Sequence, residues 1–159
     1  MLTEINNTGK ELSLGDLEGA ESELGYVFPE PYRKFLLKYN GGEPTESYID
    51  FKAEKLKLPG DAVNVFYGLG VKPCDDIIHK MKVIGCQLPE GLIFVADTPG
   101  GNYFLLSLRD DSYGEIFYKD HEFEDNSPFD PNSKMLPESI VKISNNFDDF
   151  LACLYNGDE

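Results

Sequence analysis

His121 stands between Asp120 and Glu122, and this is the combination in the sequence best suited to chemistry. An imidazole beside carboxylates is the pairing that general acid–base catalysis uses. The second histidine, His79, is distant in sequence, and neither histidine has a Cys or His neighbour at the spacing of zinc ligands. An exposed histidine at an acidic strand end is the commoner arrangement. A hydrolase or metal-dependent enzyme built on His121 and its neighbouring acids is therefore kept as an alternative only.

Paired acids recur along the chain, as Asp75-Asp76, Asp110-Asp111 and Asp148-Asp149. A glycosidase needs two carboxylates that face each other across roughly 5 to 9.5 Å, which adjacency in sequence does not provide. Adjacent acids are typical of helix starts and turns. The acidic segment DHEFEDNSPFDPN lacks the glycine and the terminal Glu of a calcium loop. We therefore expect no metal and no cofactor.

The stretch LIFVADTPGGNYFLLSLR, residues 92–109, raises the question of a phosphate-binding loop. Such a loop needs a Lys and a following helix whose N-terminus receives the anion. Here no Lys follows the glycines, and another apolar run begins at Tyr103. The pattern predicts a β-hairpin whose turn runs from Pro99 to Asn102, with glycines that accept a positive φ.

Nucleophile signatures are equally missing from the sequence. There is no G-x-S-x-G motif, and the three cysteines, Cys74, Cys86 and Cys153, form no C-x-x-C pair. Scattered, odd-numbered cysteines give no support to a disulfide framework and fit a reducing compartment. The sequence accordingly predicts a protein that is not an enzyme.

The charge is strongly negative, with 14 Lys and Arg against 29 Asp and Glu and a formal net charge of −15. Such a field repels nucleic acid and anionic membranes, so neither is expected as a partner, whereas a basic protein is attracted. No apolar run reaches about 18 residues, and the N-terminal MLTEINNTGKEL does not resemble a signal peptide. We expect one cytoplasmic domain over residues 1–159. The oligomeric state is left open.

Start signals, stop signals and apolar periodicity predict four helices. They are expected from Ser13 to Gly25, from Pro31 to Asn40, from Asp75 or Asp76 to Gly85, and from a Ser144 cap with Asp148 and Asp149 in the first turn. Apolar and β-branched runs predict strands near Tyr48–Phe51, Asn64–Gly68, Leu92–Ala96, Tyr103–Leu108 and Glu115–Lys119. Short connections make residues 92–119 an antiparallel meander, and residues 122–139 read as a long surface loop. The fold class is α+β, with an antiparallel sheet packed against the N-terminal helices and a C-terminal helix.

Four segments together resemble the SUKH superfamily (Smi/Knr-type domain). In chain order they are LGYVFPEPYRKFLLKYNGG, VFYGLG, LIFVADTPGGNYFLLSLRDDSYGEIFYKDHE and ISNNFDDFLACL, from about Leu12 to Leu154. The resemblance implies a non-enzymatic α+β domain. Nine residues that match its motifs are expected to hold the fold: Tyr32, Phe35, Leu36, Asn40, Gly41, Gly42, Gly101, Tyr103 and Phe147.

The resemblance also implies a function. Bacterial members look mostly like immunity proteins that neutralise toxin domains, frequently nucleases or deaminases, of polymorphic toxin systems. Fungal relatives resemble regulators of cell-wall synthesis. The leading hypothesis is an immunity protein that masks a basic toxin domain, and a regulatory scaffold of the cell-wall type is the alternative.

An acidic stretch from Arg109 to Asp130 is the candidate partner-binding surface. It contains eight acids against two bases, and an inhibitor of a basic enzyme gains speed and selectivity from negative charge. Aromatic residues of the kind that anchor interfaces are interleaved with these acids: Tyr113, Phe117, Tyr118 and Phe123. The expected contact residues are Asp110, Asp111, Tyr113, Glu115, Asp120, Glu122, Glu124 and Asp125.

Overall fold

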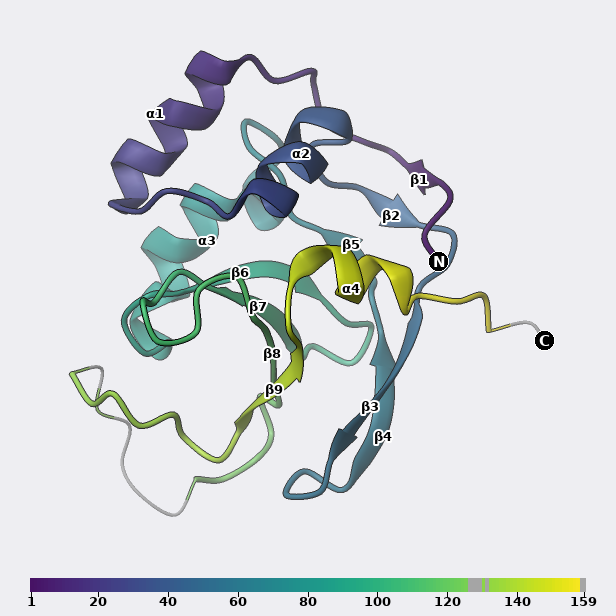
Figure 1. Cartoon of the computed structure of the whole chain (residues 1–159), viewed down its shortest axis with the longest axis vertical. Helices are drawn as coiled ribbons and strands as arrows, with labels where there is room; N and C mark the ends of the chain where they lie inside the picture. The colour runs from purple at the N-terminus through teal and green to yellow at the C-terminus, as the bar shows by residue number, and fades with distance from the viewer. Residues whose placement is uncertain (126–129, 131, 158–159) are drawn as a thin grey trace.

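Helices cover a central antiparallel sheet, and a separate β-hairpin projects from it (Figure 1). The computed structural model describes residues 1–125, 130 and 132–157. Its α-helices are α1 (Leu14–Leu24), α2 (Glu30–Lys38), α3 (Ile77–Ile84) and α4 (Phe147–Ala152), with short 3-10 turns at Pro73–Asp75 and Gly85–Gln87. The predicted α+β class is confirmed.

The strands form one five-stranded sheet and two small hairpins. The sheet has the order β5 (Val65–Phe66), β6 (Leu92–Asp97), β7 (Tyr103–Ser107), β8 (Ile116–Lys119) and β9 (Ile140–Ser144). All neighbouring strands in it are antiparallel, so the predicted meander is confirmed and extended at both edges. The hairpins pair β1 (Ile5–Asn6) with β2 (Glu43–Pro44), and β3 (Tyr48–Ala53) with β4 (Leu58–Ala62).

Local side-chain chemistry starts and ends the first and third helices as predicted. The Ser13 hydroxyl accepts a hydrogen bond from the Asp16 amide, and the Asp16 carboxylate accepts one from the Ser13 amide, which together form a capping box. Gly25 ends α1 at a φ of 83°, where a side chain would be strained. Of the two acids before α3, Asp76 is the cap, and its carboxylate accepts from the His79 amide at 3.0 Å.

The start of the last helix was predicted wrongly. Ser144 closes strand β9, and Asn146 caps α4 by accepting a hydrogen bond from the Asp149 amide at 2.8 Å. The β-branched side chains of Ile140, Val141 and Ile143 favour a strand that pairs with β8, so the chain stays extended to Ser144. Of the loop predicted over residues 122–139, residues 126–129 and 131 lie outside the described residues.

The segment after α2 also holds more strand than predicted. Strands β2 and β4 fall where the sequence is polar and contains Pro44, Pro59 and Gly60, which disfavour a strand. Gly60 is required by the pairing itself, because a Cβ at this position would lie 2.3 Å from the Ile49 carbonyl oxygen. Pairing with β3 therefore overrides the local preference.

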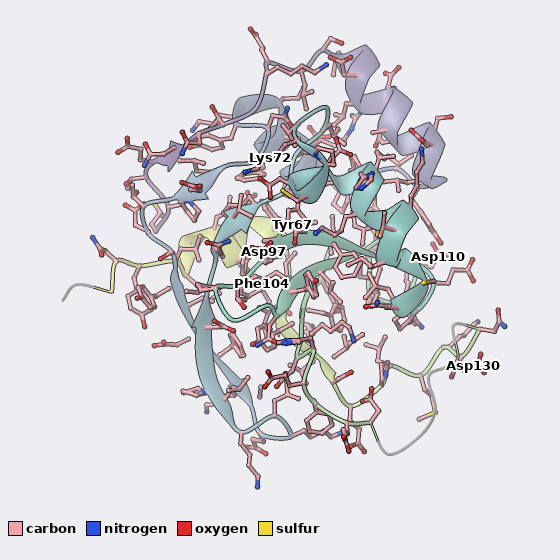
Figure 2. All side chains as sticks on the ribbon, turned by 180° about the vertical axis from the view of Figure 1, so that it is seen from behind. Tyr67, Lys72, Asp97, Phe104, Asp110 and Asp130 are labelled. Atoms are coloured by element: carbon pink, nitrogen blue, oxygen red, sulfur yellow. The ribbon has the colours of Figure 1, made fainter. Side chains whose placement is uncertain are left out.

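Aromatic rings form the part of the core in which α2 and α4 meet the sheet. Phe147 of α4 packs edge-on against Tyr32 and Phe35 of α2, with ring centroids 5.0 and 4.8 Å apart. Phe150 reaches Phe104 of β7 at 5.2 Å, and Figure 2 shows Phe104 in the middle of the molecule. All five residues are nearly inaccessible to solvent.

Asn40 joins three segments of the chain by hydrogen bonds. Its side-chain amide donates to the carbonyl oxygens of Lys10 and Leu69, and its oxygen accepts from the Leu69 amide at 2.7 Å. The backbone must turn sharply here, since Asn40 has a φ of 53° and Gly41 one of 83°. A Cβ on Gly41 would lie 2.8 Å from the Phe66 carbonyl oxygen, so the NGG segment packs directly on the FYG segment.

Candidate protein-binding site

The glycines between β6 and β7 form a hairpin turn, as predicted. The Thr98 amide donates to the Asn102 carbonyl at 3.0 Å, and the Gly101 amide donates to the Thr98 carbonyl at 3.1 Å. Gly101 has a φ of 90°, which explains a glycine at this place. The chain continues directly into β7 rather than into a helix, so the turn presents no helix N-terminus to an anion.

The eight predicted contact residues lie at two opposite ends of the β7–β8 hairpin. Strand β8 pairs Ile116 with Leu106 at one end and Lys119 with Tyr103 at the other. Ile116 and Lys119 are three residues apart, and at about 3.3 Å per residue the two ends are separated by roughly 10 Å. The connection between β7 and β8 carries Asp110, Asp111, Tyr113 and Glu115, whereas Asp120, Glu122, Glu124 and Asp125 follow β8. The acidic stretch is therefore two patches, and we call them the 110 end and the 120 end.

At the 110 end, some of the acids already have partners within the chain. Asp111 pairs with the guanidinium of Arg109 at 3.2 Å, and Glu115 pairs with Lys142 at 2.8 Å. Asp110 is exposed and makes no hydrogen bond or ion pair with the described part of the chain. Tyr113 is 48% exposed, and its hydroxyl donates to the Val27 carbonyl at 2.6 Å, which holds the ring on the surface.

At the 120 end, two of the acids serve the local fold. The Asp125 carboxylate accepts hydrogen bonds from both the amide and the hydroxyl of Ser139, and Asp120 accepts from the Glu122 amide at 3.0 Å. Glu122 and Glu124 are exposed. Among the four predicted acids at this end, these last two are the ones most accessible to a partner, although Glu122 also lies 3.6 Å from Nε2 of His121.

The aromatic residues divide differently from the prediction. Phe117 and Tyr118 are 5% and 0% exposed and belong to the core, so they are not available as interface anchors. Phe123 is partly buried against the same core. Tyr113 remains as the exposed ring among the four. Strand β8 is buried on both faces, and its apolar run allowed no distinction between core and surface.

His121 lies at the end of a hydrogen-bonded chain rather than beside a nucleophile. Its Nδ1 is 2.6 Å from the Asn102 side-chain oxygen, and its Nε2 is 3.6 Å from Glu122. The Asn102 amide donates in turn to the Tyr118 hydroxyl, which donates to Asp61 of β4. Nucleophilic catalysis requires a hydroxyl or thiol within hydrogen-bonding reach of the base, and within the described ranges no such group bonds to His121.

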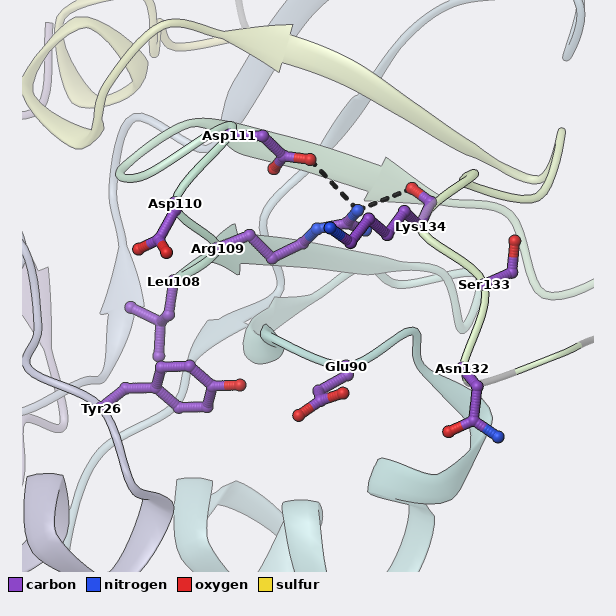
Figure 3. Close-up of a pocket in the computed structure, with 9 residues that line it drawn as sticks. All are labelled: Tyr26, Glu90, Leu108, Arg109, Asp110, Asp111, Asn132, Ser133 and Lys134. Atoms are coloured by element: carbon purple, nitrogen blue, oxygen red, sulfur yellow. Dashed lines mark hydrogen bonds and ion pairs between the residues drawn. The ribbon is translucent and has the colours of Figure 1, made fainter.

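A hollow of about 350 Å³ opens at the 110 end (Figure 3). Its lining residues are Tyr26, Glu90, Leu108, Arg109, Asp110, Asp111, Asn132, Ser133 and Lys134. The Arg109 guanidinium is turned away from the opening, toward Asp111 and the Lys134 carbonyl oxygen at 2.6 Å. Figure 2 shows Asp110 at the outer edge of the molecule, on the same side as Asp130.

Tyr26 and Glu90 were not identified from the sequence. The β6–β7 register brings Glu90 to the hollow, because Leu92 pairs with Ser107 and the Leu108 amide donates to the Gly91 carbonyl at 2.7 Å. Counting outward from the predicted turn would have placed Glu90 opposite Asp111, next to Asp110 in the chain. Burial raises the pKa of Tyr26, and the charge of Glu90 raises it further.

The described residues also bear on metal binding and on membrane crossing. No group of three or more His, Cys, Asp or Glu residues in the described ranges could hold a metal ion. None of the helices found there is long and apolar enough to cross a membrane.

Comparison with known proteins gives a match at the level of the family. A search of curated proteins finds no match to the chain. The model of the SMI1/KNR4 family (SUKH-1) matches residues 11–153, and the chain belongs to this family.

Proposed function

We propose that this protein is a non-enzymatic protein-binding module, specifically an immunity protein that neutralises a cognate toxin domain of a polymorphic toxin system. The toxin we expect is basic, a nuclease or deaminase that holds nucleic acid on a positively charged surface. The immunity protein would act in the cytoplasm by covering that surface. Family membership supports a protein-binding role, and the resemblance of bacterial members to immunity proteins supports the finer assignment.

The observation that carries the proposal is the exposed negative charge at both ends of the β7–β8 hairpin. Asp110, Glu122 and Glu124 are exposed, and Asp111 shares its charge with Arg109. A nucleic-acid-binding surface must be rich in Lys and Arg, so it is complementary to these patches. With a net charge of −15, the whole molecule adds long-range attraction, which raises the association rate.

Co-expression tests the function directly. The chain is produced together with the product of the neighbouring gene, and growth rescue and a co-purifying complex are measured. Both are expected for an immunity protein. A co-purifying complex without growth rescue would refute neutralisation and favour the regulatory scaffold. Turnover of a substrate by the chain alone, abolished by His121→Ala with the fold intact, would favour the enzyme alternative.

Two double variants test the charge argument and separate the two ends. Asp110→Asn/Asp111→Asn removes two charges at the 110 end, and Glu122→Gln/Glu124→Gln removes two at the 120 end. Each should lower the association rate with the toxin at low ionic strength about threefold or more, and each should weaken its salt dependence.

The matched control is Glu11→Gln/Glu18→Gln, because both residues are exposed and lie near the start of α1, away from either end. This control changes the net charge equally and should have a much smaller effect. If all three double variants associate with the toxin at the same rate as the unchanged protein, the charges at neither end contribute to electrostatic attraction of the toxin.

A further inference from the structure

The hollow at the 110 end brings together three polar groups that have no partner within the described structure. The Tyr26 hydroxyl and the carboxylates of Glu90 and Asp110 make no hydrogen bond or ion pair with the rest of the described chain. Figure 3 shows the Tyr26 hydroxyl directed into the hollow, with Glu90 and Asp110 on its walls. Buried Leu108 supplies an apolar wall next to the tyrosine ring.

The cations near the hollow do not neutralise these carboxylates. The guanidinium of Arg109 pairs with Asp111, and its alkyl chain lies over Gly91, where a Cβ would be 2.4 Å from Arg109 Cγ. Gly91 has a φ of 88°, so the glycine allows both this turn and this close contact. Lys134 is exposed on the rim, and its carbonyl oxygen, not its ammonium, holds Arg109. Because Arg109 is paired with Asp111, the remaining charged groups of the hollow are Glu90, Asp110 and Lys134, and their net charge is negative.

We propose that this hollow receives an arginine side chain of the protein partner, with its guanidinium between Glu90 and Asp110 and its flat face against Tyr26. The inference deepens the proposed function and rests on it, since it names the side chain by which a basic partner is recognised. A guanidinium carries five N–H donors in one plane, which suits two carboxylates and a phenol oxygen. It also stacks on aromatic rings, which a lysine ammonium does less well. A volume of about 350 Å³ leaves room for such a side chain.

A small probe tests this without the toxin. N-acetyl-arginine methylamide is titrated into the ¹⁵N-labelled protein, and the amide signals of Gly91 and Asp110 are followed by NMR. The expected result is saturable shifts with a dissociation constant on the order of 10 mM, as fits a small ligand held by few contacts. The citrulline analogue, which has nearly the same shape without the charge, should bind at least fivefold more weakly. The lysine analogue should bind about threefold more weakly.

Variants show whether the binding belongs to this hollow. Glu90→Gln/Asp110→Asn should weaken arginine binding at least fivefold, and Tyr26→Leu should weaken it about threefold. The matched control Glu11→Gln/Glu18→Gln removes the same charge near the start of α1, outside both candidate ends, and should leave the binding unchanged. Circular dichroism of each variant verifies the fold.

Several outcomes would overturn the proposal. They are the absence of saturable shifts, equal binding of the citrulline analogue, or equal losses in the hollow and control variants. None of these results would touch the proposed function, because growth rescue and co-purification test that separately. Conversely, failed rescue with intact arginine binding would remove the immunity role and leave a site for basic proteins.

Discussion

Replacing Asn40 by Ala should be among the most destabilising single changes at a polar residue. Asn40 is 1% exposed, and its amide bridges Lys10 and Leu69, which are far apart from it in sequence. Leu69 depends on Asn40 twice, because its amide and its carbonyl both bond to the same side chain, at 2.7 and 2.9 Å. Alanine would remove all three hydrogen bonds at once and leave a space that its methyl group does not fill.

The expected loss can be built from these contacts. An unpaired buried donor or acceptor costs about 1–3 kcal/mol, so the two backbone groups of Leu69 contribute about 2–6 kcal/mol. The Lys10 carbonyl is only partly buried and regains water, so it adds little. Asn40 has a φ of 53°, and in this left-handed conformation Ala is less stable than Asn by about 1 kcal/mol. We expect the free energy of unfolding to fall by about 4 kcal/mol, a large share of the roughly 5–15 kcal/mol of a typical domain.

Urea unfolding, followed by tyrosine fluorescence and circular dichroism, measures this loss. Asn7→Ala is the matched control, because Asn7 has a φ of 54° but is exposed, and among the described residues its side chain bonds only to Glu43. Asn7→Ala should cost about 1 kcal/mol, which is the backbone contribution. Asn40→Gly should cost about 1 kcal/mol less than Asn40→Ala, since glycine accepts the same φ freely. A loss in Asn40→Ala no larger than that in Asn7→Ala would refute the reasoning.

Three further predictions concern hydroxyl groups. Tyr32→Phe should leave the free energy of unfolding unchanged or raise it by up to about 1 kcal/mol, because the buried Tyr32 hydroxyl has no hydrogen-bond partner among the described residues; a clear loss in urea unfolding would contradict this. Burial raises the pKa of Tyr67 and of Tyr118 far above the usual range, so both remain protonated in the folded protein while the unfolded chain ionises near pH 10. The free energy of unfolding should therefore stay constant below about pH 10 and fall above it. Midpoints of urea unfolding, measured up to about pH 12, test this. Hydrogen bonds from Thr3 and Thr45 lower the pKa of Glu46 to about 2, so its carboxylate should titrate there in ¹³C NMR and shift upward in Thr3→Ala. This depressed pKa stabilises the fold above about pH 4.5 and the contribution disappears toward pH 2, but it is small because Glu46 is exposed to solvent.

Strong local signals made the helices and the central hairpin predictable. The apolar stripe of Tyr32, Phe35 and Leu36 repeats at helical spacing, and each of these side chains is buried. Likewise, two glycines between apolar runs gave the β6–β7 turn. In both cases one short segment carries the whole pattern, so no distant residue is needed to interpret it.

Strands that depend on distant partners were not predictable in the same way. Strand β4 forms because Gly60 fits beside Ile49, and strand β9 forms because Ile140–Ser144 completes the edge beside β8. The prediction of the candidate site was incomplete for the same reason, because the site also depends on residues that are distant in sequence. Its acids were found from their density in sequence, but the division into two ends is decided by the direction of β8, and Tyr26 and Glu90 arrive from other segments.

The hydrogen-bonded chain from Asp61 to His121 has a fixed direction. The backbone amide of His121 can only donate to the Asn102 oxygen, and the Asp61 carboxylate can only accept from the Tyr118 hydroxyl. Every donor between them must therefore point the same way, which fixes the orientation of the Asn102 amide and of the Tyr118 hydroxyl proton. It follows that Nδ1 of His121 is the donor in its 2.6 Å contact with the Asn102 oxygen. The tautomer of His121 is thus set from strand β4, which belongs to a separate hairpin, and Nε2 is left facing Glu122 at 3.6 Å.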